Sequence, residues 1–138
     1  MKGKTISQIQ LGDRASFQKT ITETDVYLYA GITGDLNPAH INESYAKNTF
    51  FQGRIVHGIL TSGLISAVLG TQLPGPGTIY ISQDLKFHAP VRFADTIIAE
   101  VEAIEIVVEK NRVKFSTVCR NQNEEVVLSG IATVMPPK

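Results

Sequence analysis

Two side chains suited to acid–base chemistry, Asp35 and His40, lie close together in the run at residues 34–40, which reads GDLNPAH. A carboxylate and an imidazole that meet at one point can hold and transfer the proton of a water molecule. Their separation would point them about 140° apart on a helix and to opposite faces on a strand. Only a bent loop brings them together, and Gly34 and Pro38 favour a bend, because glycine adopts unusual dihedral angles and proline keeps its predecessor out of the helical region. The simpler alternative is that Asp35 caps a turn while His40 lies on the surface.

A second candidate feature is the sequence VHG at residues 56–58, where the most apolar stretch of the chain begins. The first turn of a helix carries free backbone N–H groups and the positive end of the helix dipole. A glycine at that place, Gly58, lets a ligand oxygen approach the backbone closely, as an oxyanion hole requires. The alternative is that Gly58 only permits close packing. The preceding His57 is expected to be structural.

Secondary-structure elements must position these residues, and the first half of the chain carries helical signals. A short strand is predicted over 15–21. Thr22 is placed to cap a helix over 23–33, and with Asp25 it forms a capping box in which Asp replaces Glu. Gly34 is suited to end that helix.

Residues 34–42 are predicted to form a loop, and a short helix is predicted over 43–47. The next helix, over 58–70, is apolar nearly all round. A helix that is apolar on every side is buried on every side, so the rest of the chain is expected to wrap around it.

The second half of the chain is rich in Val, Ile, Thr and Phe, in runs broken by turn residues, which indicates strands. A turn rich in Pro and Gly at 73–77 leads into them. An antiparallel sheet curled around one central helix is the natural α+β architecture for this order of elements, and it is known as the hotdog fold. Four strands are predicted, over 78–87, 96–108, 112–120 and 126–135.

The composition limits the possible functions. The 138 residues include 13 Lys and Arg against 13 Asp and Glu, and 43% are hydrophobic, which suits one domain over residues 1–138. A net charge of zero argues against nucleic-acid binding and does not oppose self-association. The single cysteine, Cys119, cannot form an internal disulfide, which favours a reducing compartment. The N-terminus shows no secretory signal, and the apolar stretch 55–70 is shorter than the ~20 residues that span a bilayer, so a cytoplasmic protein without a membrane segment is expected.

Three segments together resemble a known family. They are YAGITGDLNPAH at 29–40, IVHG at 55–58 and YISQDLKFHAPV at 80–91, and they resemble motifs of the MaoC-like family in the same order. More narrowly, the chain is similar to the R-specific enoyl-CoA hydratases over nearly its whole length. The resemblance implies a hotdog homodimer that adds water reversibly to a trans-2-enoyl-CoA thioester and gives the R-3-hydroxyacyl product. It implies neither a cofactor nor a metal ion.

The resemblance implies that Asp35 and His40 are the catalytic dyad and that the Gly58 N–H binds the thioester carbonyl. Hydration builds negative charge on that oxygen, and an N–H group stabilises such a charge. Our interpretation is that His40 activates the water, while Asp35 orients it and helps to return the proton to C2. The sequence leaves the division of these two roles open, because paired groups titrate jointly.

Further roles also follow from the resemblance. On the central helix, Ser66 is the expected support for the dyad, and Ser62, one turn earlier, is the less favoured alternative. Asn37 and Leu69 are assigned to substrate binding, and Leu69 is expected to face the acyl chain.

Other functions would use the same residues. The dyad could run in reverse on R-3-hydroxyacyl groups carried by acyl carrier protein, but no basic rim for such a carrier is evident. A thioesterase is disfavoured, because the loop lacks the usual carboxylate arrangement of that class. Retention of both dyad residues speaks against a non-catalytic acyl-CoA-binding subunit. A metal site formed by Asp35, His40 and His57 matches no zinc spacing. Basic residues that could meet CoA phosphates, unless they are simply solvated, are Lys4, Lys86, Arg92 and Lys110.

Overall fold

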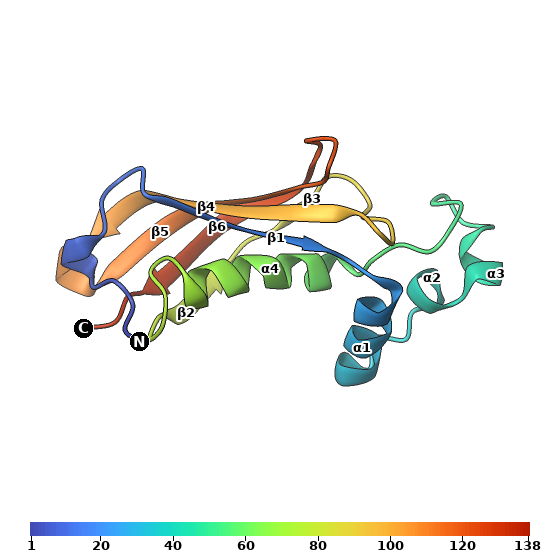
Figure 1. Ribbon diagram of the computed structural model, residues 1–138, viewed down its shortest axis with the longest axis horizontal. Coiled ribbons are helices and arrows are strands. Elements are labelled where there is room, and N and C mark those ends of the chain that lie inside the picture. The colour runs from blue at the N-terminus through green and yellow to red at the C-terminus, as the bar shows by residue number, and fades with distance from the viewer.

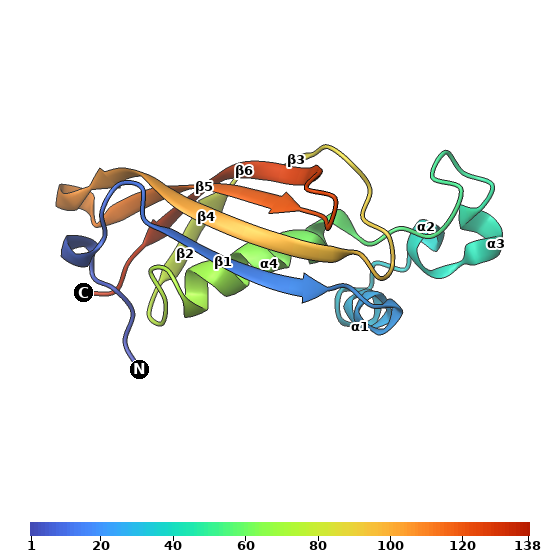
Figure 2. The ribbon, with the colours of Figure 1, turned by 45° about the horizontal axis from the view of Figure 1, so that its top comes forward.

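The computed structural model describes all residues from 1 to 138 and shows one sheet with a helix lying across one of its faces (Figure 1). All strand pairs are antiparallel, and the helix is α4, Gly58–Thr71. Five strands cross the sheet in the order β1 (Arg14–Thr20), β4 (Thr96–Val107), β5 (Arg112–Arg120), β6 (Val126–Met135) and β2 (Ile79–Gln83), as Figure 2 shows. A short sixth strand, β3 (Lys86–Phe87), pairs with the first half of β6. The antiparallel sheet with a central helix that was predicted is therefore confirmed, and its arrangement is that of the hotdog fold.

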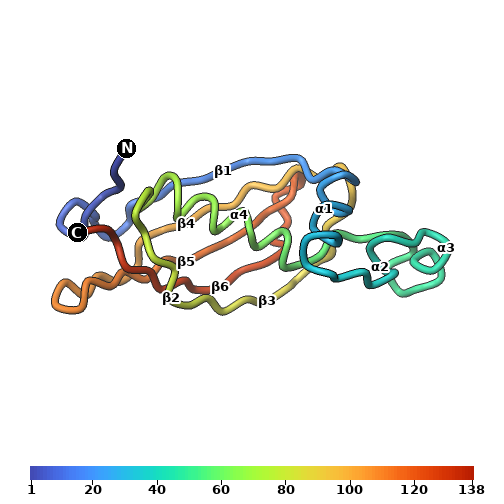
Figure 3. The backbone as a smooth tube through the Cα atoms, turned by 90° about the horizontal axis from the view of Figure 1, so that it is seen from below, coloured from blue at the N-terminus to red at the C-terminus, as the bar shows by residue number.

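Three shorter helices gather at one end of the sheet, next to the N-terminal end of α4 (Figure 3). They are α1 (Glu23–Thr33), α2 (Pro38–Ile41) and α3 (Glu43–Ala46). Both chain termini lie towards the opposite end (Figure 1). Two short 3₁₀ turns, at Ile6–Gln8 and Val108–Lys110, were not predicted. No helix is long and apolar enough to cross a bilayer.

The hydrophobic core lies between α4 and the sheet. Successive side chains of a strand face opposite sides, and on β5 the residues Val113, Phe115 and Cys119 face the core and are fully buried. From α4, Ile65 and Val68 pack into the same core and are also fully buried. Burying apolar surface in this way is the main force that holds the helix against the sheet.

The predicted first strand and the predicted helix over 23–33 are both confirmed within a residue. Thr22 Oγ1 accepts the Asp25 N–H at 3.1 Å, and the Asp25 carboxylate accepts the Thr22 N–H at 2.9 Å, which completes the capping box. Gly34 ends the helix with a φ of 79°, a conformation that glycine adopts without strain.

The prediction that the central helix is buried on every side is wrong. The sheet is a single layer and covers one face of α4, so the opposite face stays open. The residues exposed on that face include Ile59, Gly63, Ser66 and Gly70.

Two further predictions need correction. The loop predicted over 34–42 contains α2, because Asn37 and Pro38 start a single helical turn there. The strand predicted over 78–87 is split into β2 and β3 by Asp84 and Leu85. The Asp84 carboxylate accepts the Ile131 N–H at 2.7 Å, and this bond takes the place of regular strand pairing at the break.

Candidate active site

The chain turns sharply after α1, between Gly34 and α2. Asn37 caps α2, since its side-chain oxygen accepts the Ala39 N–H at 3.0 Å, and Pro38 occupies the first turn of this helix. His40 therefore lies on a helical turn rather than on a loop. The turn brings His40 back towards Asp35, which remains in the connecting segment.

The structure brings the Asp35 carboxylate and the His40 imidazole together. One oxygen of Asp35 and one ring nitrogen of His40 lie within 4.8 Å of each other. Two hydrogen bonds of about 2.8 Å each span up to about 5.6 Å, so a single water can bridge the two groups. His40 is 9% exposed, whereas 47% of the Asp35 side chain is exposed. The site thus pairs a buried imidazole with an accessible carboxylate.

His40 donates its Nδ1 hydrogen to the backbone oxygen of Ile55, 2.7 Å away. A carbonyl oxygen only accepts hydrogen bonds, so the neutral ring carries its hydrogen on Nδ1 and its lone pair on Nε2. The imidazole can therefore accept a proton at Nε2 while Nδ1 stays anchored to the backbone.

His57 lies against both members of the dyad. Its ring stacks on that of His40, with centroids 3.9 Å apart, and its Nε2 donates to the backbone oxygen of Asp35 at 3.1 Å. Burial lowers the pKa of His57, and the nearby His40 lowers it further, although the Asp35 contacts oppose the shift. His57 is thus an uncharged ring that holds the Asp35 backbone in place, which agrees with a structural role.

The same three side chains also place possible metal-ligand atoms within 4.8 Å of one another. However, Nδ1 of His40 and Nε2 of His57 already donate to backbone oxygens. The arrangement of Asp35, His40 and His57 therefore suits a hydrogen-bonded acid–base pair better than a metal centre.

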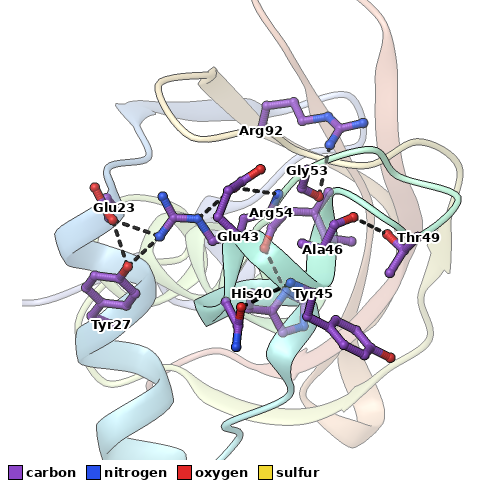
Figure 4. Close-up of polar contacts among 12 residues, drawn as sticks. Glu23, Tyr27, His40, Glu43, Tyr45, Ala46, Thr49, Gly53, Arg54 and Arg92 are labelled. Carbon is purple, nitrogen blue, oxygen red and sulfur yellow. Dashed lines mark hydrogen bonds and ion pairs between the residues drawn. The ribbon is translucent and has the colours of Figure 1, made fainter.

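Arg54, the residue directly before Ile55, contacts side chains of two helices (Figure 4). Its Nε donates to Glu43 at 3.0 Å, and its Nη1 donates to Glu23 at 2.8 Å. Tyr27 donates to the same Glu23 carboxylate at 2.7 Å, and the hydrogen bonds from Tyr27 and Arg54 lower the pKa of Glu23. Glu23 and Tyr27 belong to α1, and Glu43 belongs to α3. The Arg54 guanidinium therefore links both helices to the segment that contains Ile55.

A pocket of about 470 Å³ opens beside His40 at the N-terminal end of α4, and most of its lining is hydrophobic. Gly58 forms part of this lining, and the N–H groups of Gly58, Ile59 and Leu60 have no acceptor within the protein. A methyl group on Gly58 would lie 2.5 Å from Cε1 of Phe87, so the glycine is also what allows the Phe87 ring to pack closely on the first turn of α4. The pocket can therefore hold an apolar ligand with one oxygen at the helix terminus.

Of the residues assigned to the site, His40 and Gly58 line this pocket, whereas Asp35, Asn37, Ser66 and Leu69 do not. Ser66 is exposed on the open face of α4, eight residues beyond its first residue, which is about 12 Å along the helix axis. Ser62 donates its hydroxyl hydrogen to a carbonyl of its own helix at 2.6 Å. Leu69 is buried in the core, and Asn37 caps α2. Within one chain, neither serine is brought to the dyad.

Two residues of the site were not predicted from the sequence. Thr61 lines the pocket, and its buried hydroxyl has no hydrogen-bond partner. A polar residue in the first turn of a mostly apolar helix was the available signal. Arg54 directly precedes the IVHG motif, and its charge next to a buried segment was a signal as well.

Arg92, one of the basic residues considered for CoA phosphates, donates to the backbone at Gly53 (Figure 4). Its guanidinium donates to the backbone oxygens of Phe51 and Gly53, at 2.5 Å and 3.4 Å. Phe51 lines the pocket, so Arg92 fixes the shape of this part of the lining.

Comparisons with known proteins agree with this geometry. Residues 7–127 match the family described as the MaoC like domain. The chain is 55% identical to an (R)-specific enoyl-CoA hydratase of Rhodospirillum rubrum, over 94% of this chain and 89% of that protein. It is 48% identical to a 3-hydroxybutyryl-CoA dehydratase of Methylorubrum extorquens, over 94% of this chain and 82% of that protein. Among solved structures, the unliganded R-hydratase PhaJ1 from Pseudomonas aeruginosa superimposes with a TM-score of 0.93 and 40% identity, over 99% of this chain and 88% of that chain.

Proposed function

The chain belongs to the MaoC-like domain family, and from this premise we propose that it is an R-specific enoyl-CoA hydratase. The enzyme adds water reversibly to a trans-2-enoyl-CoA thioester and forms R-3-hydroxyacyl-CoA. The observation that carries the proposal is the spacing of at most 4.8 Å between the Asp35 carboxylate and the His40 ring, beside a pocket that bears a free Gly58 N–H.

The proposed reaction begins with a water that is hydrogen-bonded to both members of the dyad. His40 Nε2 accepts a proton from this water, and the oxygen forms a bond to C3 of the enoyl group. The electrons of the C2–C3 double bond move towards the thioester, so negative charge develops on the carbonyl oxygen. The Gly58 N–H stabilises that charge, because it lies at the positive end of α4.

The second half of the reaction returns a proton to C2. The anchored tautomer of His40 supports its role as the proton acceptor, and the accessible carboxylate of Asp35 is placed to orient the water and to help deliver the proton. Because one water and one dyad serve both bonds, the new O–C3 and H–C2 bonds form on the same face of the substrate.

We also propose that two copies of the chain form a homodimer. The single-layer sheet leaves one face of α4 open, and the edge strand β2 exposes Ile79, Tyr80 and Ile81. A row of unpaired backbone groups beside exposed apolar side chains favours pairing with a second strand. If Ser66 supports the dyad as predicted, it does so from the partner subunit, since it lies too far from the dyad in its own chain. The cytoplasmic location stays a prediction.

The direct test of the activity uses crotonyl-CoA, with the enoyl absorbance and the release of thiol followed in parallel. Loss of absorbance without thiol release supports a hydratase, whereas thiol release would indicate a thioesterase. The same assay with the crotonyl thioester of acyl carrier protein distinguishes the carrier-protein dehydratase, which would prefer that substrate. No turnover of either thioester would favour a binding subunit instead.

A further inference from the structure

Thr61 carries an unusual hydroxyl. Its Oγ1 is one of only two buried side-chain polar atoms in the molecule without a hydrogen-bond partner, and the residue is fully buried. Other helix threonines have partners even though they are exposed: Thr33 and Thr71 donate to carbonyls of their own helices, at 2.8 Å and 2.6 Å. Thr117, also fully buried, donates to the Gly130 carbonyl at 2.9 Å. Leaving a buried hydroxyl unpaired costs stability, so its persistence at position 61 points to a ligand.

Thr61 belongs to the lining of the pocket that also includes Gly58 and His40. Side chains of a helix lean towards its N-terminus, so the Thr61 side chain covers the first turn of α4. That turn is where the free N–H of Gly58 lies. A hydroxyl donor and a backbone donor therefore serve the same end of a mostly apolar pocket.

The second unpartnered atom is Nδ1 of His57, four residues earlier. Because His57 donates from Nε2 to the Asp35 backbone, its Nδ1 carries a lone pair and can only accept. The structure records no bond between this nitrogen and Thr61, so the hydroxyl remains available to a ligand.

We propose that Thr61 donates its hydroxyl hydrogen to the carbonyl oxygen of the bound thioester, as a second oxyanion donor beside the Gly58 N–H. This inference rests on the proposed function. An unsubstituted enoyl group offers a single hydrogen-bond acceptor, its carbonyl oxygen, so a donor in the acyl pocket has one possible partner. As negative charge grows on that oxygen during the attack at C3, both hydrogen bonds strengthen, and Thr61 acts as a catalytic residue.

The test compares two substitutions at position 61. Thr61→Val keeps the shape and removes the hydroxyl, and Thr61→Ser keeps the hydroxyl. We expect Thr61→Val to lower kcat for crotonyl-CoA hydration about 10- to 100-fold with little change in KM, because it removes a donor that acts mainly in the transition state. Its Tm should be unchanged or higher, since the variant no longer buries an unpaired hydroxyl. Thr61→Ser should retain kcat within about 3-fold of wild type.

The control is Thr117→Val, which removes a buried hydroxyl that already has partners. It should lower Tm and leave kcat nearly unchanged, which is the opposite pattern. Wild-type kcat in Thr61→Val would overturn the proposal, and so would equal losses in Thr61→Val and Thr61→Ser accompanied by a lower Tm. Inactivity of the wild-type protein would instead contradict the proposed function, so the two failures can be told apart.

Discussion

The imidazole rings of His40 and His57 lie with their centroids 3.9 Å apart, and each ring donates one N–H to a backbone oxygen of a different segment. His40 binds the oxygen of Ile55, just before α4, and His57 binds the oxygen of Asp35, just after α1. The stacked pair therefore joins the stretch at 35–40, which carries the dyad, to the stretch at 55–57, which leads into α4. This contact, rather than the loop alone, sets the distance between Asp35 and His40.

The stacked pair leads to a prediction about stability and pH. The pKa of His57 is lowered in the folded protein, mainly by burial, from an ordinary value of 6.5. The unfolded chain therefore binds the proton more readily, and His57 contributes stability that is present above about pH 6.5 and is lost as the pH falls through its lower folded pKa. We expect the free energy of unfolding, measured with denaturant, to decline below about pH 6.5.

The matched variant for this measurement is His57→Gln, whose side-chain amide can still donate to the Asp35 carbonyl but does not titrate. Its free energy of unfolding should fall less steeply between about pH 6.5 and pH 5 than that of wild type. The carboxyls whose pKa is lowered, Glu23 and Asp25, act at lower pH because their ordinary values are 4.5 and 3.8. Equal slopes for wild type and His57→Gln in this interval would show that His57 is not the titrating group.

The dyad prediction concerns Asp35→Asn and His40→Asn. Asp35→Asn keeps an oxygen for the Asn37 N–H, and His40→Asn can place an amide N–H near the position of Nδ1, where it can still bind the Ile55 carbonyl. Each change removes one proton-transferring group, so each should lower kcat by ~10²-fold or more with little effect on KM. The double variant should lose much less than the product of the two factors, because both groups act on one water.

Thermal melting of the same variants separates this prediction from the alternative in which Asp35 only caps a turn. Asp35→Asn should melt close to wild type, since nearly half of the Asp35 side chain is exposed. Preserved activity together with a clear fall in Tm would support the capping role and refute the catalytic one.

Arg54 is expected to act on catalysis from a distance, as a positioning residue. Arg54→Gln removes its bonds to Glu43 and Glu23 and so loosens the segment that holds the Ile55 oxygen against His40. Because a misplacement of about 1 Å can cost up to ~10²-fold in rate, we expect kcat to fall about 10-fold, and Arg54→Lys to recover only part of it.

The control for Arg54 is Arg14→Gln, at the far edge of the sheet. Arg14 pairs with Glu102 at 3.2 Å on β4 and touches no part of the site. The Arg14→Gln variant should leave kcat unchanged. If Arg54→Gln shows wild-type rates and an unaltered pH profile of kcat, the hydrogen bonds of Arg54 to Glu43 and Glu23 only stabilise the fold.

The homodimer prediction compares the open edge of the sheet at β2, which is the proposed interface, with the outer face of the sheet at β4. Ile81 on β2 is 46% exposed at the open edge, and Ile98 on β4 is 40% exposed on the outer face of the sheet. Ile81→Lys should weaken association, since it places a charge at the proposed interface, whereas Ile98→Lys should not. Sedimentation equilibrium measures both, and a wild-type protein that stays monomeric at micromolar concentration would disprove the dimer.

Local signals in the sequence predicted most elements. The capping box of Thr22 and Asp25 and the terminal Gly34 defined α1 to the residue, because these contacts lie within one turn of each other. The two errors at α4 and β2 have a different origin. Whether a face of α4 is covered depends on the number of layers that pack on it, and the break at Asp84 depends on a hydrogen bond to Ile131, which is distant in sequence.

Only part of the candidate site could be predicted from the sequence, because only part of it depends on local signals. Asp35, His40 and Gly58 belong to short motifs, so their types and order were visible. The stacking of His57 on His40 and the anchoring of Ile55 by Arg54 arise only when α1, α3 and the start of α4 meet in space. The unpaired hydroxyl of Thr61 depends on the burial and rotamer of its side chain, and a sequence specifies neither directly.

The central claim, hydration on one face of the enoyl group, is tested most directly by the stereochemistry of the product. Crotonyl-CoA is hydrated by the wild-type protein, and the product is divided between an R-specific and an S-specific 3-hydroxyacyl-CoA dehydrogenase, with NADH or NADPH formation as the readout. If Asp35 and His40 hold the water on one face, the R-specific enzyme should oxidise all of the product and the S-specific enzyme none. Substantial oxidation by the S-specific enzyme would contradict the assignment.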